Sequence, residues 1–157
     1  MENLNNQIIQ AARAGEITTL KELIAQKANL NAQDEKGFTP LIFACYNNQF
    51  EAAKILLEAG ADVNLPDFSG NTPLMGTAFK GYIPIAKLLI ENGAAVNTQH
   101  ATGTTALMFA AMFGRNDMVK LLLEHGADKS LHDNRGITAQ DLAAKQGNET
   151  AISLLST

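Results

Sequence analysis

The stretch DFSGNTPLMGTAFKG (67–81) is the one most suggestive of chemistry, because its glycines and its lysine resemble a phosphate-binding loop. A Walker-type loop needs two glycines separated by four residues, followed by Lys and Ser or Thr. Gly76 and Gly81 have this spacing, but Tyr-Ile follows at 82–83. The tetrapeptide Asp-Phe-Ser-Gly at 67–70 is not the Asp-Phe-Gly of protein kinases. We therefore expect no phosphate site here.

The remaining candidates for catalysis or metal binding do not form a pattern. The three histidines lack the spacing and the carboxylate or thiolate partners of a metal site. Cys45 is the single cysteine, so no intramolecular disulfide can form. Aspartates recur at one turn position in separate units, which is typical of turn caps rather than of a catalytic dyad. We expect a chain with no enzymatic activity, no cofactor and no metal. The residues considered are His100, His125, His132, Asp34, Asp67 and Asp133.

Composition indicates the class of protein. The 157 residues are 46% hydrophobic and 18% charged, with a formal net charge of −4, which argues against nucleic acid as a partner. The apolar runs are too short to span a bilayer, and the N-terminus lacks the pattern of a signal peptide. A lone thiol fits a reducing compartment. We expect a cytoplasmic protein that does not bind membranes.

The chain repeats itself every 33 residues. One glycine recurs four times, and a threonine follows each copy two positions later. The segments KILLEAGADVN (54–64), KLLIENGAAVN (87–97) and KLLLEHGADKS (120–130) align without a gap. Such a period indicates a solenoid of stacked units. The recurring pairs are Gly37 and Thr39, Gly70 and Thr72, Gly103 and Thr105, and Gly136 and Thr138.

Each unit is predicted to be a turn, a helix, a loop and a second helix. Thr is expected to cap the first helix, with Pro or Ala in its first position. That helix is expected to end at Gly81 and its equivalents, with Asn48 taking the left-handed position in the first full unit. Apolar residues at helical spacing predict the second helix, and Pro84 falls at the start of one such helix, where proline is tolerated.

The units DEKGFTPLIFACYNNQFEAAKILLEAGADVN and DFSGNTPLMGTAFKGYIPIAKLLIENGAAVN resemble ankyrin repeats. The resemblance covers essentially the whole chain and implies an all-α repeat solenoid, a curved stack of helix pairs with hairpin-like turns on one side. One departure concerns the family's histidine after Thr-Pro-Leu, which is Ile42, Met75 or Met108 here, so we expect apolar packing to replace the Thr–His hydrogen bond. The division predicted is an N-terminal cap (1–33), internal repeats (34–66, 67–99 and 100–132) and a C-terminal cap (133–157).

The resemblance implies that a partner binds the concave side, which is formed by the turn tips and the exposed face of the first helices. Five of the nine aromatic residues fall on these positions. Tyr46, Phe79 and Met112 occupy one equivalent position and should form a stripe. The stripe has two explanations that do not exclude each other: a binding groove, since monomers seldom expose large apolar patches without using them, and rings that pack on one another between repeats. The candidate partner-binding residues are Phe38, Tyr46, Phe68, Asn71, Phe79, Lys80, Thr104, Met112, Phe113 and Arg135.

These observations favour a non-enzymatic module that binds a protein partner. An inhibitory protein that occludes an enzyme such as a kinase is one alternative, and a scaffold with no retained partner is another. We expect a monomer, with weak self-association left open as a third use of the apolar stripe. Scattered cations near the concave side suggest an apolar peptide or helix with acidic edges as the target. Those cations are Arg13, Lys36, Lys80, Arg135 and Lys145.

Phe43 and Phe109 share one equivalent position, whose counterpart in the middle unit is Gly76, followed by Thr77 where the others have alanine. We expect both phenyl rings in the core, with Gly76 making room for a neighbouring ring. On this interpretation Gly76→Leu would clash and lower the free energy of unfolding by roughly 1–3 kcal/mol.

Overall fold

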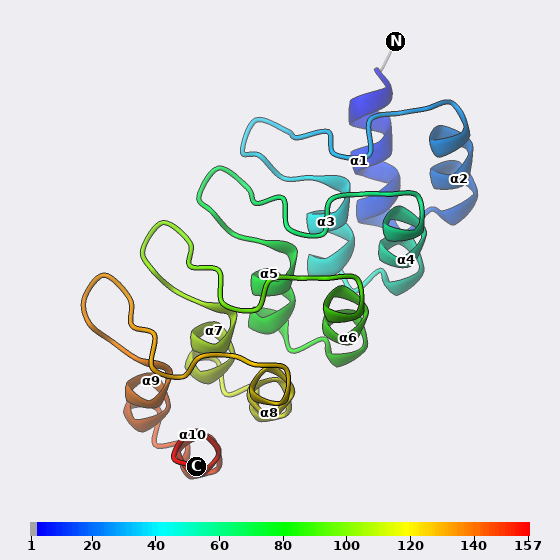
Figure 1. Cartoon of the computed structure of the whole chain (residues 1–157). Helices are drawn as coiled ribbons and strands as arrows, with labels where there is room; N and C mark the ends of the chain where they lie inside the picture. The colour runs from blue at the N-terminus through cyan, green and yellow to red at the C-terminus, as the bar shows by residue number, and fades with distance from the viewer. Residues whose placement is uncertain (1–2) are drawn as a thin grey trace.

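The computed structural model describes residues 3–157, and within this range the chain forms ten helices (Figure 1). The extended segments of residues 3–157 contribute a single antiparallel bridge, between His132 and Thr138. The expected all-α solenoid is confirmed. In chain order the helices are α1 (Leu4–Ala14), α2 (Ile17–Ala25), α3 (Pro40–Tyr46), α4 (Phe50–Glu58), α5 (Pro73–Lys80), α6 (Ile83–Glu91), α7 (Ala106–Met112), α8 (Asn116–Glu124), α9 (Ala139–Lys145) and α10 (Glu149–Leu155).

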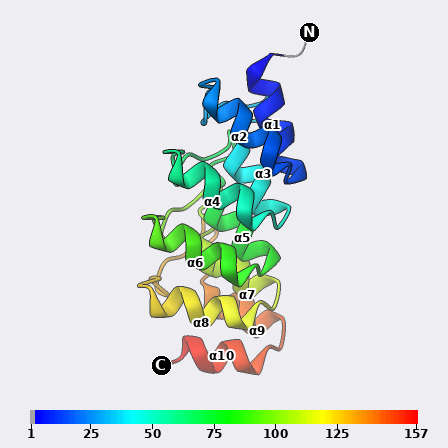
Figure 2. The same cartoon turned by 90° about the vertical axis from the view of Figure 1, so that its right-hand side faces the viewer.

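The helices form two layers. Successive pairs stack on one another, so that α1 and α10 lie at opposite ends, and the hairpins project to one side of the odd-numbered helices (Figures 1 and 2). Odd-numbered helices pack against each other more closely than even-numbered ones do. The hairpins and the odd-numbered helices therefore form the concave side. The boundaries at 34, 67, 100 and 133 stay predictions.

Small side chains allow this close approach. One position in the odd-numbered helix of each repeat is always Ala or Thr and is buried, so a small side chain stands there in every unit. The threonine at this position, Thr77, is fully buried, and its hydroxyl donates a hydrogen bond of 2.8 Å to the carbonyl oxygen of Pro73. A buried hydroxyl is thus satisfied within its own helix. The equivalent residues are Ala11, Ala44, Thr77, Ala110 and Ala143.

The first helix of each full unit begins as predicted. The threonine hydroxyl accepts a hydrogen bond from the backbone N–H three residues later, as between Thr39 and Ile42 at 3.1 Å. In the second unit the Sδ atom of Met75 also accepts from the N–H of Thr72, at 3.5 Å. Apolar packing does replace the histidine at Met75, which is buried in the core, and its sulfur adds a weak acceptor that the sequence did not predict.

Helix ends also follow the sequence. Gly81 ends α5 with φ 79°, a left-handed conformation that residues with a Cβ atom resist. Asn48 adopts φ 58° at the equivalent position after α3. Pro84 lies in the first turn of α6, as expected.

Hydrogen bonds join the hairpins of adjacent repeats at a constant spacing. The N–H of Phe68 donates to the carbonyl of Lys36 at 3.1 Å, and that of Ala101 donates to Ser69 at 3.0 Å. The N–H of Asn134 continues the series to Thr102 at 3.0 Å. Because each bond links one repeat to the next, the hairpins form a continuous wall beside the odd-numbered helices.

Asparagine side chains also join adjacent repeats, in the segments that lead from each second helix to the next hairpin. Asn31, Asn64 and Asn97 each accept a hydrogen bond at Oδ1 from a backbone N–H 31 residues later, at 2.8–2.9 Å. Asn64 and Asn97 also donate from Nδ2 to the carbonyls of Gly93 and Gly126. The "ADVN"-like segments therefore hold neighbouring repeats in register. In residues 3–157 no helix has the length and apolar character needed to cross a membrane.

Candidate functional site

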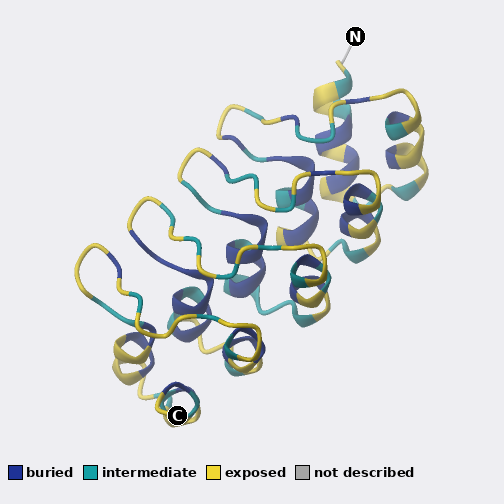
Figure 3. Cartoon of the chain, viewed as in Figure 1, coloured by how far each residue is buried: buried dark blue, intermediate teal, exposed yellow. Residues whose placement is uncertain are grey.

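A cavity of about 640 Å³ opens on the concave side, between the hairpin wall and the odd-numbered helices. The hairpin wall contributes Phe38, Asn71 and His100 to it. Figure 3 shows exposed hairpin tips beside the helices α3, α5 and α7, which are largely buried. We call this cavity the groove, and its helix side is formed by Arg13, Ile42, Phe43, Tyr46, Met75, Gly76, Phe79 and Phe109.

The absent side chain of Gly76 deepens the groove. Phe43 and Phe109 stand at the same position in the flanking repeats, and both line the cavity. A Cβ atom added to Gly76 would have one heavy-atom neighbour within 4 Å, Cδ1 of Tyr46 at 3.4 Å. The middle repeat therefore leaves open space between two phenyl rings.

This arrangement corrects one expectation and bears on another. Phe43 and Phe109 are half-buried and pack against the core from outside it, so they are not core residues. Gly76 does have the ring of Tyr46 beside it, but at ordinary contact distance, and a longer side chain would extend into the groove. No clash is thus seen at the Cβ position of Gly76, because the position faces a cavity rather than a filled interior, and the loss of stability expected for Gly76→Leu stays a prediction.

Aromatic rings contact one another along the helix side of the groove. Tyr46 and Phe79 stack with centroids 6.1 Å apart, and Phe79 meets Phe113 edge to face at 4.5 Å. Phe79 also lies 6.5 Å from Phe109. The expectation that the rings pack between repeats is thus correct. The ring contact from Phe79 runs to Phe113, one residue beyond Met112, because Met112 is half-buried against the core.

Rings on the hairpins meet rings on the helices across the groove. Phe38 contacts Phe43 edge to face at 5.4 Å, and His100 contacts Phe109 in the same way at 5.4 Å. Such edge-to-face contacts fix the rings in defined orientations. The groove is therefore bounded at both ends by an aromatic pair, with Gly76 between them.

Two cations lie on the faces of these rings. The guanidinium carbon of Arg13 is 5.3 Å from the Phe43 centroid, and Nζ of Lys80 is 4.7 Å from that of Tyr46. Both distances are within the range of a cation–π contact. Across residues 3–157 the one ion pair joins Arg135 to Asp133 at 3.3 Å, so neither Arg13 nor Lys80 is neutralised by a carboxylate there.

The carboxylate of Asp67, which lines the groove, already accepts hydrogen bonds from its own hairpin. Oδ1 of Asp67 accepts backbone N–H groups of Ser69 and Asn71, each at 2.9 Å, and Oδ2 accepts Nδ2 of Asn71 at 3.2 Å. Its charge is used to hold the hairpin. The cation of Arg13 is therefore the unpaired charge that lines the groove.

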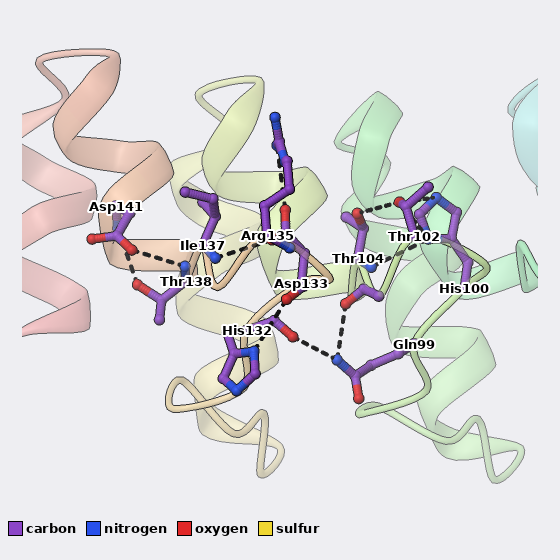
Figure 4. A network of polar contacts seen from close by, with 11 residues as sticks. Gln99, His100, Thr102, Thr104, His132, Asp133, Arg135, Ile137, Thr138 and Asp141 are labelled. Atoms are coloured by element: carbon purple, nitrogen blue, oxygen red, sulfur yellow. Dashed lines mark hydrogen bonds and ion pairs between the residues drawn. The ribbon is translucent and has the colours of Figure 1, made fainter.

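In the next hairpin the imidazole of His100 takes the place of the Asp67 carboxylate as acceptor of a backbone N–H (Figure 4). The backbone N–H of Thr104 donates to Nδ1 of His100 at 3.2 Å, in the place where Asp67 receives the N–H of Asn71. Nδ1 must be unprotonated to accept this bond, which puts the proton of the neutral ring on Nε2. The sequence has His here where the other hairpins have Asp, but it did not reveal this role.

The last hairpin uses Asp133, whose Oδ1 accepts the N–H groups of Arg135 and Ile137 at 2.8 and 3.0 Å (Figure 4). The N–H of Ile137 is the main cause that holds the pKa of Asp133 below its ordinary value, and Arg135 acts in the same direction. This carboxylate is a turn cap, as the sequence predicted.

The structure brings four of the ten candidate partner-binding residues into the groove, namely Phe38, Tyr46, Asn71 and Phe79. Phe68 is the most exposed of the aromatic candidates, at 69%, and it contacts Gly37 in the preceding hairpin. Thr104 is buried at 7% exposure, so its predicted accessibility was wrong. Lys80, Met112, Phe113 and Arg135 lie outside the lining of the groove.

Several residues that line the groove were not predicted from the sequence to do so. They are Phe43, Met75, Gly76, His100 and Phe109. The order Phe, Gly, Phe at one repeat position was the available signal. It was interpreted as packing, because the sequence does not say whether that face points to the core or to the hairpins.

The thiol of Cys45 does not contribute reactivity. It is buried, and burial raises its pKa to about 12, against a smaller opposing effect of a hydrogen bond with Thr77. A thiol of this kind is a poor nucleophile. Among the residues that the structure describes, no three side chains of the metal-binding types gather in one place.

Comparison with known proteins agrees with this geometry. The model of a family described as ankyrin repeats (3 copies) matches residues 8–100 and 75–157. A 52-residue stretch, 32% of the chain, is 40% identical to a protein of Emericella nidulans named palmitoyltransferase akr1. The chain spans 7% of the length of that relative, so the likeness concerns a short part of it.

Proposed function

We propose, on the premise that the chain belongs to the ankyrin-repeat family, that its concave groove binds a protein partner and that it does so without catalysis. Ankyrin repeats are in general protein-interaction modules, and the choice of this groove as the binding face is our proposal. The stretch shared with a palmitoyltransferase is too short a part of that protein to carry an enzymatic activity to this chain.

One observation supports this face above others, namely that large apolar side chains stay accessible on it. Tyr46 and Phe113 are 42% and 44% exposed although rings of adjacent repeats contact them. Aromatic residues in a concave, partly desolvated setting are typical of interface centres. The cavity of about 640 Å³ also falls within the range of binding pockets, about 300–1,000 Å³.

We further propose that the protein is monomeric and that it binds this partner in the cytoplasm. The single buried thiol is compatible with a reducing compartment. Scattered cations and a net charge of −4 favour a protein over a nucleic acid.

The proposal is tested by capture of partners from a cytoplasmic extract, with identification by mass spectrometry. Wild type is compared with Phe79→Ala/Phe113→Ala, which removes the 4.5 Å ring contact and its accessible surface. We expect the double variant to lose the captured proteins while retaining the helical circular dichroism of wild type.

Lys54→Ala/Lys87→Ala is the matched control, because both lysines are exposed on the even-numbered helices α4 and α6, away from the groove. It should capture what wild type captures. If the folded Phe79→Ala/Phe113→Ala variant captures the same proteins equally well, the groove is not the binding face.

A further inference from the structure

We infer that the groove is a specificity pocket for one aromatic side chain of the partner, inserted beside Gly76 and followed or preceded by a carboxylate that pairs with Arg13. The inference rests on the proposed function and adds to it the chemistry of the partner segment. It comes from three features of this chain: the missing side chain, the rings around it and an unpaired cation at one end.

The first feature is a space of the right shape. In the flanking repeats the position of Gly76 carries Phe43 and Phe109, so the middle repeat lacks a phenyl ring between them. A Cβ atom at Gly76 would meet Tyr46 at 3.4 Å and nothing else within 4 Å. A ring supplied by a partner can therefore occupy the space that a third phenylalanine side chain would fill.

The second feature is the orientation of the surrounding rings. Phe43 and Phe109 are each held edge to face by a hairpin ring, Phe38 and His100, at 5.4 Å. Phe79 lies 6.5 Å from Phe109 on the helix side. Aromatic pairs favour such offset and edge-to-face arrangements, so the pocket offers oriented edges and faces to an incoming ring. An aliphatic side chain would gain apolar contact but not these ring contacts.

The third feature is charge. Arg13 lines the pocket, lies over Phe43 and has no carboxylate partner in residues 3–157. Asp67, the acid in the lining, is already occupied by the N–H groups of its own hairpin. A guanidinium beside an apolar pocket pairs well with a carboxylate, since it binds both oxygens in a fixed geometry. The complementary segment is thus aromatic and acidic.

The test uses the whole chain as bait for a random peptide library, followed by measurement of Kd for the enriched peptides. We expect enriched peptides to share an aromatic residue with Asp or Glu close to it. Replacing that aromatic residue by Ala should weaken binding about tenfold or more, as for an interface hot spot.

Gly76→Phe is the decisive variant of the chain, because it restores the ring present in both flanking repeats and fills the pocket from inside. The residue lies within α5 and does not adopt a positive φ, so a side chain is compatible with its backbone. We expect a loss of affinity of about tenfold or more with an unchanged helical spectrum. Gly76→Met, with a flexible side chain, gives the same test should the phenyl ring disturb folding.

Arg13→Gln tests the charge. It should weaken binding of the acidic peptide several-fold, and it should have little effect on the matched peptide in which Asn or Gln replaces the acid. Lys54→Gln, on the other face of the molecule, serves as the control and should leave both affinities unchanged.

The outcomes separate the inference from the proposed function. Suppose that folded Gly76→Phe binds the peptides like wild type while Phe79→Ala lowers their affinity. The aromatic pocket beside Gly76 is then refuted, and the groove stands as the binding face. Enriched peptides that lack an aromatic residue also overturn the pocket. If neither variant alters binding, or if no peptide is enriched, both the pocket and the binding face are contradicted.

Discussion

The rings of Phe79 and Phe113 meet edge to face with centroids 4.5 Å apart, although the two residues belong to adjacent repeats. Phe79 also stacks on Tyr46 in the preceding repeat at 6.1 Å, so one ring links three units of the solenoid. Its accessible face is part of the groove. The same residue therefore contributes to the stability of the stack and to the surface proposed to bind a partner.

Phe79→Ala should lower the free energy of unfolding by about 1–3 kcal/mol, less than a fully buried phenylalanine, because the side chain is only half-buried. Phe113→Ala should cost about 1 kcal/mol, since its ring is 44% exposed. Urea unfolding followed by circular dichroism measures both.

The double variant Phe79→Ala/Phe113→Ala then gives the coupling between the rings. We expect a coupling free energy of about 0.5–1.5 kcal/mol for an edge-to-face pair. Strictly additive effects would mean that the 4.5 Å contact contributes nothing beyond its buried area.

Gly76→Ala should raise the free energy of unfolding by about 0.5–1 kcal/mol, because glycine inside a helix is less favourable than alanine. The added methyl group has only Cδ1 of Tyr46 nearby, at 3.4 Å. Thermal unfolding is the measurement. A lower melting temperature would show that Tyr46 cannot shift, and that Gly76 is there to accommodate it.

His100→Ala should lower the free energy of unfolding by about 1–3 kcal/mol, because the backbone N–H of Thr104 would lose its acceptor in a partly buried hairpin. His100→Asp should recover most of this loss, since aspartate accepts the equivalent N–H at position 67. Comparison of the two melting temperatures checks the role assigned to Nδ1. Equal destabilisation by Ala and Asp would contradict it.

Acid should weaken the last hairpin through Asp133. Hydrogen bonds from Ile137 and Arg135 lower the pKa of this carboxyl in the folded state, below its ordinary value of 3.8. The folded state therefore binds fewer protons than the unfolded state in this range. The resulting stability is fully present above about pH 4 and is lost as the pH falls through the lower, folded-state pKa.

Asp133→Asn keeps an oxygen that can accept both N–H groups but removes the titrating charge. The free energy of unfolding of Asp133→Asn should consequently fall less steeply than that of wild type as the pH drops below about 4. Arg135→Gln should keep most of the wild-type slope, because the N–H of Ile137 is the main cause of the shift. An Asp133→Asn slope equal to that of wild type would exclude this carboxylate as a source of acid sensitivity.

Much of the fold could be predicted from the sequence, because its signals are local. Thr39 and its equivalents cap helices, Gly81 and Asn48 end them, and Pro84 lies at a helix start, as expected. Each of these effects depends on the backbone within one turn of the residue. The 33-residue period then implies the stack.

The groove was harder to predict, because its depth depends on contacts between repeats. Phe43 and Phe109 were expected in the core, yet they lie where the odd-numbered helices face the hairpin wall. The sequence likewise did not reveal that Thr104 would be buried beneath its own hairpin, nor that Met75 would accept a hydrogen bond at sulfur. The positions of Phe43, Phe109 and Thr104 depend on how hairpin and helix pack together, which no local signal determines. The Met75 contact is instead local to the first turn of α5, and it depends on the conformation of a flexible side chain.

The central claim is that a protein partner binds the concave groove, and its most direct test is the Kd of one purified, captured partner for wild type and for Phe79→Ala. With both chains folded by circular dichroism, we predict binding about tenfold weaker or worse for Phe79→Ala and no change for Lys54→Ala. Equal Kd values for wild type and Phe79→Ala would contradict the claim.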